Sequence, residues 1–452
     1  MKLAPLLILP LAVGFAWLAS CGTEPIAGSY ALSREQLQDP ESCRSCHAQH
    51  VDEWSGSMHA YASDDPIFRA LNKMMLRDTK GANPSFCVQC HAPVALREGA
   101  TKDGSNLDQL PASMRGVTCY FCHSVSAVEG THNNPLRLAD DLTMRGGISN
   151  PTTNKAHRSG YSSLHDREHL DSAKLCGTCH DIVNPLGTHI ERTFSEWQSS
   201  LFADPQLGKQ LTCGKCHTPG RTDVAANAPG VGLRTVHDHK MPGVDVAVTP
   251  FPQLAEQRAA VQASLNTTLT AKLCVRPGRL GTDVEVTVDN SFAGHGWPSG
   301  AMPDRRAWVE VEAFRDGSSA FSVGKVAADR SLVEVATGDW LLFRDYGYTE
   351  GKKLTHHLWE IASYESKQLT PSVTNNTQDP RFYHALTKVY EVTGSVEKVT
   401  MAVHIRPVDF DLVDELIASG DLDSAVRSKI STFTLENTVL EWNASKGFGC
   451  TK

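Results

Sequence analysis

The second part of the chain alternates apolar and polar residues with period two. The alternation is clearest in "DVEVTVDN" (283–290), "RAWVEVEAF" (306–314) and "KVTMAVHIR" (398–406), which Gly and Asp/Asn turns separate from their surroundings. This pattern is typical of strands with one buried face. It predicts a small β-sandwich, with a helical insertion at 409–420 and a last strand at "STFTLENTVLEW" (431–442).

The first part of the chain has apolar residues at helical spacing instead. "SDDPIFRALNKMMLRD" (63–78) predicts the clearest helix, with cap candidates at Ser63–Asp65 and Pro66 in its first turn. A second helix is predicted over 253–265, and the Gly- and Pro-rich residues 218–252 are predicted to be a crossing loop.

Composition and charge restrict the class of protein. The 452 residues have ordinary apolar content and no charged blocks, which favours a globular chain of two or three domains. A net charge of −8 and the lack of a basic stripe argue against binding to nucleic acid. After the N-terminus, the sequence has no apolar run long enough to span a bilayer.

The N-terminus predicts export. "MKLAPLLILPLAVGFAWLASCG" has one lysine and an apolar core, as in a signal peptide. "LASC" resembles a bacterial lipobox, in which cleavage leaves Cys21 as a lipidated first residue; several acyl chains would anchor the protein firmly. The alternative is ordinary signal cleavage with Cys21 incidental. Either way we expect an oxidising compartment, periplasmic or at the cell surface of the outer membrane.

One short motif, CxxCH, occurs five times before residue 220 and contains ten of the thirteen cysteines. Its cysteines are Cys43, Cys46, Cys87, Cys90, Cys119, Cys122, Cys176, Cys179, Cys213 and Cys216. Its histidines are His47, His91, His123, His180 and His217.

CxxCH is the attachment motif of c-type haem: both thiols form thioether bonds to the porphyrin, and the histidine is the proximal iron ligand. A zinc site has no use for a histidine at the next position five times over, and a redox CxxC normally occurs once. The sequence therefore predicts five c-type haems. They share about 35 residues each, so they must pack closely together and supply much of the apolar core.

The sequence thus predicts an α+β chain of two domains: a mostly helical and loop multihaem cytochrome c domain followed by the β-sandwich. The expected ranges are a lipoprotein signal peptide at 1–20, a tether at 21–40, the pentahaem domain at 41–252, a connecting helix at 253–271 and the sandwich at 272–452.

The sixth ligand of each iron decides between an electron carrier and an enzyme. Histidine is abundant and methionine scarce, which favours two histidines per iron and low potentials. Nine other histidines lie in or beside this region: His50, His59, His132, His157, His165, His169, His189, His237 and His239.

One of these histidines lies in a short internal repeat of the sequence. "EWSGSMHA" (53–60) and "EWQSSLFA" (196–203) match at Glu, Trp, Ser and Ala, with His59 where the second copy has Phe202. If the two segments are equivalent helices, His59 can bind iron and Phe202 can only pack against a ring. Chance similarity is the alternative.

Several phrases carry a resemblance to a known family. "CRSCHAQHVDEWSGSMHA", "GVTCYFCHSV", "LCGTCHDIVNPLG", "TFSEWQSS" and "VHDHKMPGVDVAV" resemble multihaem cytochromes c related to the tetrahaem cytochrome of ammonia oxidisers. "NSFAGHGWPSGAMPDRRAWVEVEAF" resembles a β domain found after such haem regions. The fifth CxxCH departs from the four-haem pattern, which leaves the pairing of ligands with haems open.

The resemblance implies an electron-transfer protein with stacked haems. It carries over His59, His157 and His239 as distal ligands, with His132, His165 and His237 as further candidates. His295 in "GHGWPSG" is either a structural turn residue or a ligand that reaches a haem from the β region. Cys274 and Cys450, near the two ends of that region, are a candidate disulfide.

Two functions remain open on the sequence. The first is a lipid-anchored electron carrier between redox partner proteins. The second is an oxidoreductase that acts on a small nitrogen or sulfur compound at one iron with an open position. All five motifs end in His, which favours the carrier. A related interpretation is that the β region mediates assembly into a complex or a filament.

Overall fold

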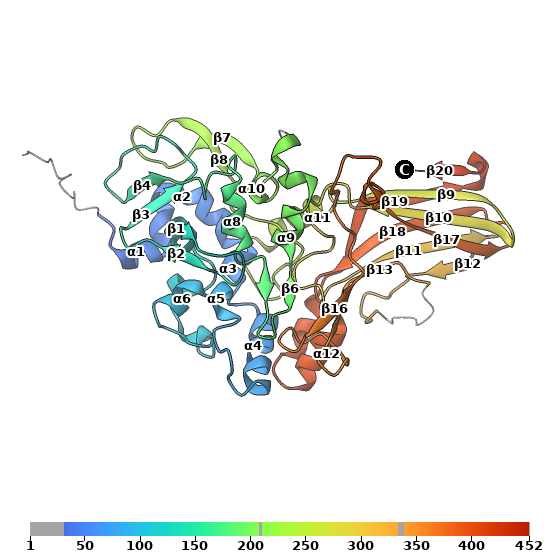
Figure 1. Ribbon diagram of the computed structural model, residues 1–452, viewed down its shortest axis with the longest axis horizontal. Coiled ribbons are helices and arrows are strands. Elements are labelled where there is room, and N and C mark those ends of the chain that lie inside the picture. Colours follow the sequence, from blue (N-terminus) through green and yellow to red (C-terminus); the bar gives the residue numbers. More distant parts are fainter. Residues whose placement is uncertain (1–30, 208–209, 333–338, 452) are drawn as a thin grey trace, which may run out of the picture.

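The structure is a computed structural model that describes residues 31–207, 210–332 and 339–451. The predicted signal peptide, the lipidation site Cys21 and the tether as far as residue 30 lie outside the described residues. The described residues combine helices with several small and two larger sheets, as expected for an α+β protein (Figure 1). Among them, no helix combines the length and the apolar character needed to cross a bilayer.

The motif-bearing region, up to about residue 250, is built from short helices and loops. Its helices are α1 (Arg34–Gln38), α2 (Pro40–Ser55), α3 (Met58–Tyr61), α4 (Pro66–Asp78), α5 (Val88–His91), α6 (Pro93–Arg97), α7 (Cys119–His123), α8 (Asp171–Gly177), α9 (Thr193–Gln198) and α10 (Cys213–His217). The prediction for α4 is confirmed: Asp65 is the N-cap, its side chain accepts a hydrogen bond from the Ile67 N–H, and Pro66 occupies the first turn.

Four pairs of short strands connect the helices, where the sequence predicts only helices and loops. The pairs are β1 (Val125–Val128) with β2 (Leu136–Leu138), β3 (Thr143–Gly146) with β4 (Arg158–Tyr161), β5 (Ile182–Val183) with β6 (His189–Glu191), and β7 (Gly220–Val224) with β8 (Leu233–His237). The β7–β8 hairpin corrects the expectation of a loop over 218–252. Its strands are mostly solvent-accessible and hold few apolar residues, so they leave no period-two signal in the sequence.

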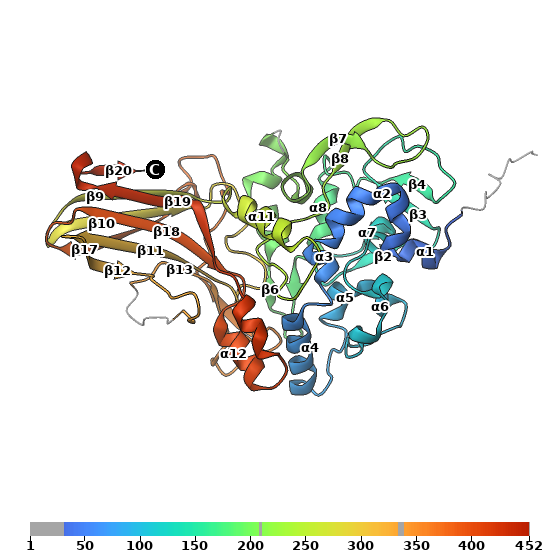
Figure 2. The same ribbon diagram turned by 180° about the vertical axis from the view of Figure 1, so that it is seen from behind.

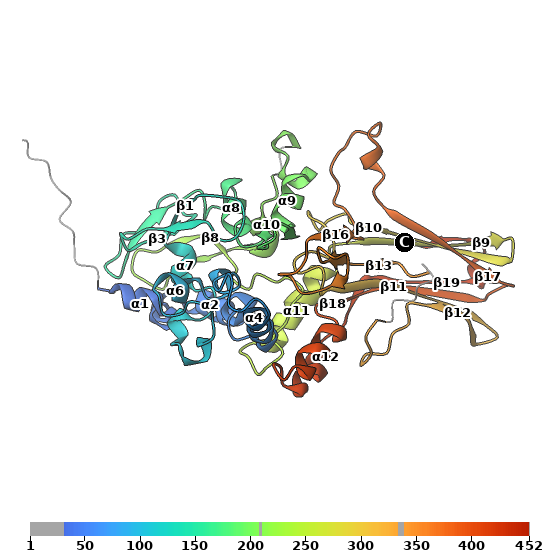
Figure 3. The ribbon, with the colours of Figure 1, turned by 60° about the horizontal axis from the view of Figure 1, so that its bottom comes forward.

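Two antiparallel sheets form most of the C-terminal region. One has the strand order β17-β10-β9-β20; the other has the order β12-β11-β18-β19, and β13 also pairs with β11. Their strands are β9 (Thr270–Gly278), β10 (Gly281–Asp289), β11 (Arg306–Arg315), β12 (Ser318–Val323), β13 (Leu342–Phe343), β17 (Leu386–Thr393), β18 (Lys398–Arg406), β19 (Phe433–Asn443) and β20 (Gly449–Thr451). Figure 3 views the long strands nearly edge-on, in two layers.

One apolar core lies between these sheets. It takes Val284, Val286 and Val288 from β10 and Val309 and Val311 from β11, all fully buried. The two-domain division and the β-sandwich stay predictions, which the shared core of the two sheets supports. The helix α11 (Leu254–Leu265), predicted over 253–265, adds its own apolar side chains to this core.

The last strand is β20, which corrects the prediction that the segment 431–442 ends the fold. Cys450 in β20 lies directly opposite Cys274 in β9, and the two form a disulfide. Three residues are too few to give a periodic signal, so the sequence pattern does not reveal β20.

The two regions meet through helices α4 and α12 (Phe410–Ala418), which lie side by side in Figures 1 and 2. Their interface is an apolar cluster that includes Ile67, Met74, Leu412 and Leu416. Cys87, the first residue of the second motif, packs against the same cluster. A small sheet of β14 (Asp345–Tyr348), β15 (Leu354–Thr355) and β16 (Ser363–Ser366) lies nearby in the C-terminal region.

Candidate haem sites

Each CxxCH motif occupies about one helical turn. The first lies inside α2, which is kinked at His47; the second, third and fifth form α5, α7 and α10 almost by themselves, and the fourth continues from the end of α8. A single turn places two cysteines three positions apart on the same side and the histidine directly after them. This is the local geometry that a doubly attached haem requires.

All five motif histidines have a hydrogen-bond partner at Nδ1. In His47, His91 and His217 this nitrogen donates to the carbonyls of Ala225 (2.8 Å), Ala62 (2.9 Å) and Pro242 (2.7 Å). The Nδ1 of His123 donates to the Arg145 carbonyl, and that of His180 to a Glu191 carboxylate oxygen at 3.3 Å. A proton held on Nδ1 leaves the Nε2 lone pair for a metal, the arrangement found in metal-bound histidines. The residues therefore fit haem iron.

Burial favours the neutral form of most of these imidazoles. It lowers the pKa of His47, His91 and His123, and it lowers the pKa of His217 to about 4. His180 differs: burial opposes its charge, but the hydrogen bond and the negative charge of Glu191 raise its pKa to about 9. A carboxylate partner makes an imidazole a stronger electron donor, so an iron bound at His180 would have a different environment from one bound at any of the other four histidines.

Three predicted distal histidines face motif histidines at the separation that a shared iron requires. With metal–nitrogen bonds of about 2 Å, two imidazoles on opposite sides of one ion have ring centroids roughly 6 Å apart. The observed separations are 6.2 Å for the pair His157 and His47, 6.3 Å for His239 and His123, and 6.1 Å for His59 and His180.

The hydrogen bonds of these distal histidines also fit ligation. The Nδ1 of His157 donates to the Arg158 carbonyl at 3.1 Å, and that of His239 donates to the His237 carbonyl at 3.0 Å. The Nδ1 of His59 lies 3.0 Å from the sulfur of Met241. In each case Nε2 is left for iron.

The other three predicted candidates do not leave an Nε2 facing a motif histidine in the same way. The ring of His165 also lies near His123, with centroids 5.7 Å apart, but its Nε2 donates to the Cys122 carbonyl at 2.8 Å. The ring of His132 lies against His189, with centroids 5.7 Å apart. The imidazole of His237 lies beside Arg167, with its Nδ1 3.3 Å from a guanidinium nitrogen. These contacts favour structural roles for all three.

On the sequence, two roles are open for His295: a structural turn residue or an iron ligand. In the structure His295 lies near His217. The charge of His295 is a cause, second to burial, of the lowered pKa of His217. Its Nδ1 donates to the Gly296 carbonyl at 2.8 Å, the pattern of the other distal histidines. Glu196 on α9 fixes the loop by accepting hydrogen bonds from the Gly296 N–H (3.0 Å) and the Ser299 hydroxyl (3.1 Å).

His91 has an environment of its own. Its ring stacks on Phe68, with centroids 3.9 Å apart and planes 3° from parallel. Within the described part of the chain, no histidine lies opposite His91 in the way that His157 lies opposite His47.

Thiols of different motifs meet in the structure. The thiols of Cys43 and Cys119, of Cys90 and Cys179, and of Cys176 and Cys213 lie close enough to shift one another's pKa. These contacts bring the first motif beside the third, and the second and fifth beside the fourth. The thiol of Cys122 is close enough to Cys179 and Cys176 for their charges to raise its pKa, an effect added to that of burial. The five motifs therefore form one continuous cluster.

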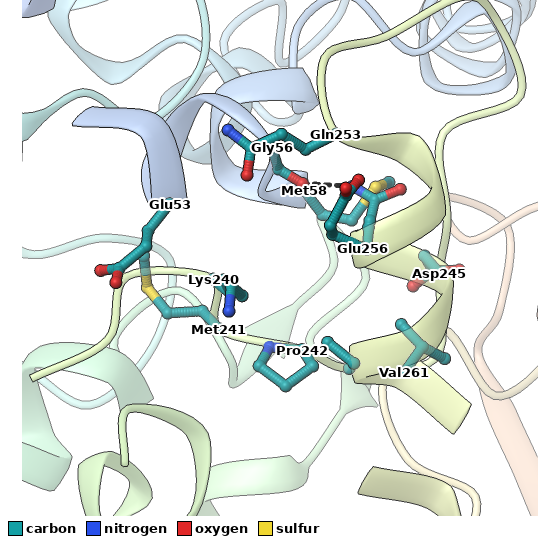
Figure 4. A pocket seen from close by; sticks show the side chains of 13 residues that line it. Glu53, Gly56, Met58, Lys240, Met241, Pro242, Asp245, Gln253, Glu256 and Val261 are labelled. Atoms are coloured by element: carbon teal, nitrogen blue, oxygen red, sulfur yellow. Dashed lines mark hydrogen bonds between the residues drawn. The ribbon is translucent and has the colours of Figure 1, made fainter. Parts of the chain in front are cut away.

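A pocket lies between the motif-bearing region and α11 (Figure 4). Glu53, Lys240 and Met241 line one side of it, and Gln253 and Glu256 line the other. Its empty space is about 330 Å³, including the part open to solvent. Met241 connects it to the cluster, since the sulfur of Met241 contacts His59.

Comparison with known proteins supports this interpretation of the site. Residues 42–124, which include the first three motifs, match the family model described as cytochrome c554 and c-prime. The fold is similar to the crystal structure of a penta-heme cytochrome c552 from Thermochromatium tepidum, at 19% sequence identity and a TM-score of 0.60, over 90% of this chain and 99% of that one. No curated protein sequence matches the chain. The family match and the fold together support a multihaem c-type cytochrome in electron transfer.

Proposed function

We propose that this chain holds five covalently bound c-type haems and passes electrons between redox partner proteins. The observation that carries the proposal is the shared state of the five motif histidines: each has a hydrogen-bond partner at Nδ1, and its Nε2 is left for iron. Each haem, when bound, supplies an iron that takes up and releases one electron.

The chain's own residues hold and orient these groups. Each motif contributes two thiols for thioether bonds and one imidazole for the iron. We assign His157, His239 and His59 as the distal ligands opposite His47, His123 and His180, on the ring separations given above. The proximity of His295 to His217 supports a fourth such pair, with a ligand from the C-terminal region.

The contacts between thiols support an order for electron transfer. Because Cys43 meets Cys119 and Cys122 lies near Cys176, the route runs from the first motif through the third to the fourth. The second and fifth motifs then flank the fourth through Cys90 and Cys213.

Haem stoichiometry tests the proposal directly. The pyridine haemochrome absorbance per chain, measured with the intact mass of the protein purified from its native host, should give five haems. A preparation with fewer haems, or with zinc or disulfides on the motif thiols, contradicts the proposal.

A second candidate function rests on His91. Its nearest aromatic neighbour is Phe68, and an iron bound there without a second imidazole has a position open to a small ligand. The activity in this case is oxidation or reduction of a small nitrogen or sulfur compound. Electron paramagnetic resonance of the oxidised protein separates the two functions. A high-spin ferric signal that nitrite or hydroxylamine perturbs favours the enzyme, and low-spin signals alone favour the carrier.

We also propose that the protein is exported and anchored through a lipidated Cys21, on the periplasmic or the cell-surface side of the outer membrane. The lipobox-like "LASC" and the Cys274–Cys450 disulfide support export, since disulfides persist in oxidising compartments. A Cys21→Ser variant should appear in the soluble fraction. A variant that stays with the membrane contradicts the lipid anchor.

A further inference from the structure

Two adjacent histidines and a glutamate converge in the C-terminal region, away from the CxxCH motifs. His356 and His357 follow β15, and Glu415 projects from α12. The Nε2 of His356 lies 2.6 Å from one oxygen of Glu415, and the Nε2 of His357 lies 3.0 Å from the other. The three potential ligand atoms all lie within 4.8 Å of one another.

The far side of each ring faces another carboxylate. The Nδ1 of His357 lies 3.3 Å from Glu360, and the Nδ1 of His356 lies 3.9 Å from Asp411. A carboxylate behind a histidine is the usual second partner of a metal-bound imidazole, because it fixes the ring and raises its basicity. The ring of His357 is also held by stacking on Trp359, with planes 11° from parallel.

A buried acid adds to the negative charge near this cluster. Asp304 is 3% exposed, and its Oδ1 has no hydrogen-bond partner among the described residues. It lies close enough to His356 for the two to interact electrostatically. Arg306 offsets part of the charge, since it donates to Asp411 at 2.8 Å. The histidine side chains are only 16–17% exposed, so the ligand atoms are largely withdrawn from water yet still reachable.

We propose that His356, His357 and Glu415 bind one divalent transition-metal ion of the zinc class, separate from the haem irons. Two imidazoles and one carboxylate form a common zinc site, with water as the fourth ligand. Imidazole ligands exclude Ca²⁺ and Mg²⁺, which prefer oxygen. On binding, the Nε2 protons that face Glu415 leave to solvent and both Nε2 lone pairs go to the metal, while the Nδ1–H groups stay oriented toward Glu360 and Asp411.

The place of the cluster in the fold indicates what the metal does. Asn184, four residues after the fourth motif histidine, donates to the carbonyls of Leu358 (2.9 Å) and Ile361 (2.7 Å) in the same loop. On its other side the loop contacts α12, which packs on α4 and Cys87. A metal that joins the loop to α12 therefore braces the junction between the two regions, next to the second and fourth motifs.

The test uses the full-length haem-loaded protein, prepared without a histidine tag and treated with EDTA. Isothermal titration with Zn²⁺ should give one site per chain. Glu415→Gln and His357→Gln should each weaken binding by about 100-fold or more, as loss of a direct ligand costs at least as much as loss of its supporting partner. His384→Gln is the matched control, because His384 forms an ion pair with the single carboxylate of Asp289 at 2.9 Å.

Two results of the titration would overturn the proposal: no Zn²⁺ uptake by the wild type, or equal uptake by the wild type and both ligand variants. The haem absorbance spectrum reports whether the variants fold. X-ray absorption at the zinc edge of the zinc-loaded wild type gives an answer that needs no variant, since the absorption edge of haem iron lies at a different energy. We expect nitrogen and oxygen ligands at about 2.0–2.2 Å. A zinc-edge spectrum with six oxygens and no imidazole would also overturn the site.

Discussion

The indole Nε1 of Trp54 donates a hydrogen bond of 2.8 Å to the carbonyl of Val117, two residues before the third motif. Trp197 makes the same bond, also 2.8 Å, to the carbonyl of Leu211, two residues before the fifth motif. The repeated segments "EWSGSMHA" and "EWQSSLFA" are thus equivalent in structure. In each, the tryptophan donates a hydrogen bond to the backbone two residues before a later CxxCH motif.

The equivalence extends to the end of each phrase. Ser57 and Ser200 each cap the turn that follows, and the next positions to compare are His59 and Phe202. Phe202, in the second of the two repeated segments, packs beside Gly294. His295 directly follows Gly294 in sequence and therefore lies close to this second segment. The similarity between the two segments therefore reflects an equivalent structure. Where the second segment has a phenylalanine in place of the histidine, a histidine from outside the repeat lies nearby.

The tryptophan bonds give a first prediction. Trp54→Phe and Trp197→Phe keep the apolar ring but lose the hydrogen bond, which leaves a carbonyl without its donor and costs about 1 kcal/mol of stability. We expect a change in the spectrum or the potential of one haem in each variant. Trp442→Phe is the control, since its bond of 2.9 Å to the Gly447 carbonyl lies far from the motifs in sequence. Equal effects on the haems in all three variants contradict the role of the repeat.

His59→Met tests the distal assignment. Methionine in place of histidine raises the potential of a haem iron, so one midpoint potential should increase while the others keep their values. Spectroelectrochemical titration measures this. His132→Met is the matched control, because His132 contacts His189 rather than a motif histidine. Unchanged potentials in His59→Met would remove it from the ligands.

Glu191→Gln tests the environment of His180. The carboxylate of Glu191 makes the imidazole more electron-donating and stabilises ferric iron. The neutral amide removes this effect, so the midpoint potential of that haem should rise by on the order of 60 mV, a tenfold change in its equilibrium. Glu196→Gln, which instead removes the charge of the α9 carboxylate that accepts a hydrogen bond from the Ser299 hydroxyl, should leave the His180 haem unchanged. A potential in Glu191→Gln that falls or stays the same contradicts the assignment.

Asp65 gives a prediction about pH. Burial raises the pKa of this N-cap carboxyl to about 6, above its value in the unfolded chain. The folded state therefore holds the proton more tightly, and Asp65 lowers stability as the pH rises from about 4 to 6, by up to about 3 kcal/mol. Asp65→Asn keeps the cap without the charge. The thermal midpoints of the two proteins should differ little at pH 4, and the variant should be the more stable at pH 7. A constant difference across this range contradicts the prediction.

The disulfide gives a prediction about stability. The bond between Cys274 and Cys450 closes a loop of 176 residues. Its removal by Cys274→Ala with Cys450→Ser should lower the free energy of unfolding by about 2–5 kcal/mol, mainly through the greater freedom of the unfolded chain. Urea unfolding followed by tryptophan fluorescence measures this. Wild type under reducing conditions should match the double variant, and an unchanged unfolding midpoint in both contradicts the prediction.

The sequence predicts the local features of this protein well. The α4 helix and the strands β10, β11 and β18 form where the pattern places them, because each has a strong period and clear turn or cap residues at its ends. The five motifs are read directly from residue spacing.

Long-range features were harder to predict. The proximity of His295 to His217 depends on how a loop of the C-terminal region packs on α9, and no local pattern carries that information. The β7–β8 hairpin and β20 are held by backbone pairing rather than by buried side chains. The structural contact of His165 with the Cys122 carbonyl likewise depends on tertiary packing.

The contact between Cys43 and Cys119 has a consequence for how the protein is made. In the folded chain these thiols, and two similar pairs, lie within reach of each other although their motifs are far apart in sequence. Under the export and haem attachment proposed above, a chain that folded before haem was attached would be exposed to cross-linking between motifs, since neighbouring thiols form disulfides readily under oxidising conditions. On that proposal we expect haem to be attached while the polypeptide is still open, or the thiols to be kept reduced until it is attached.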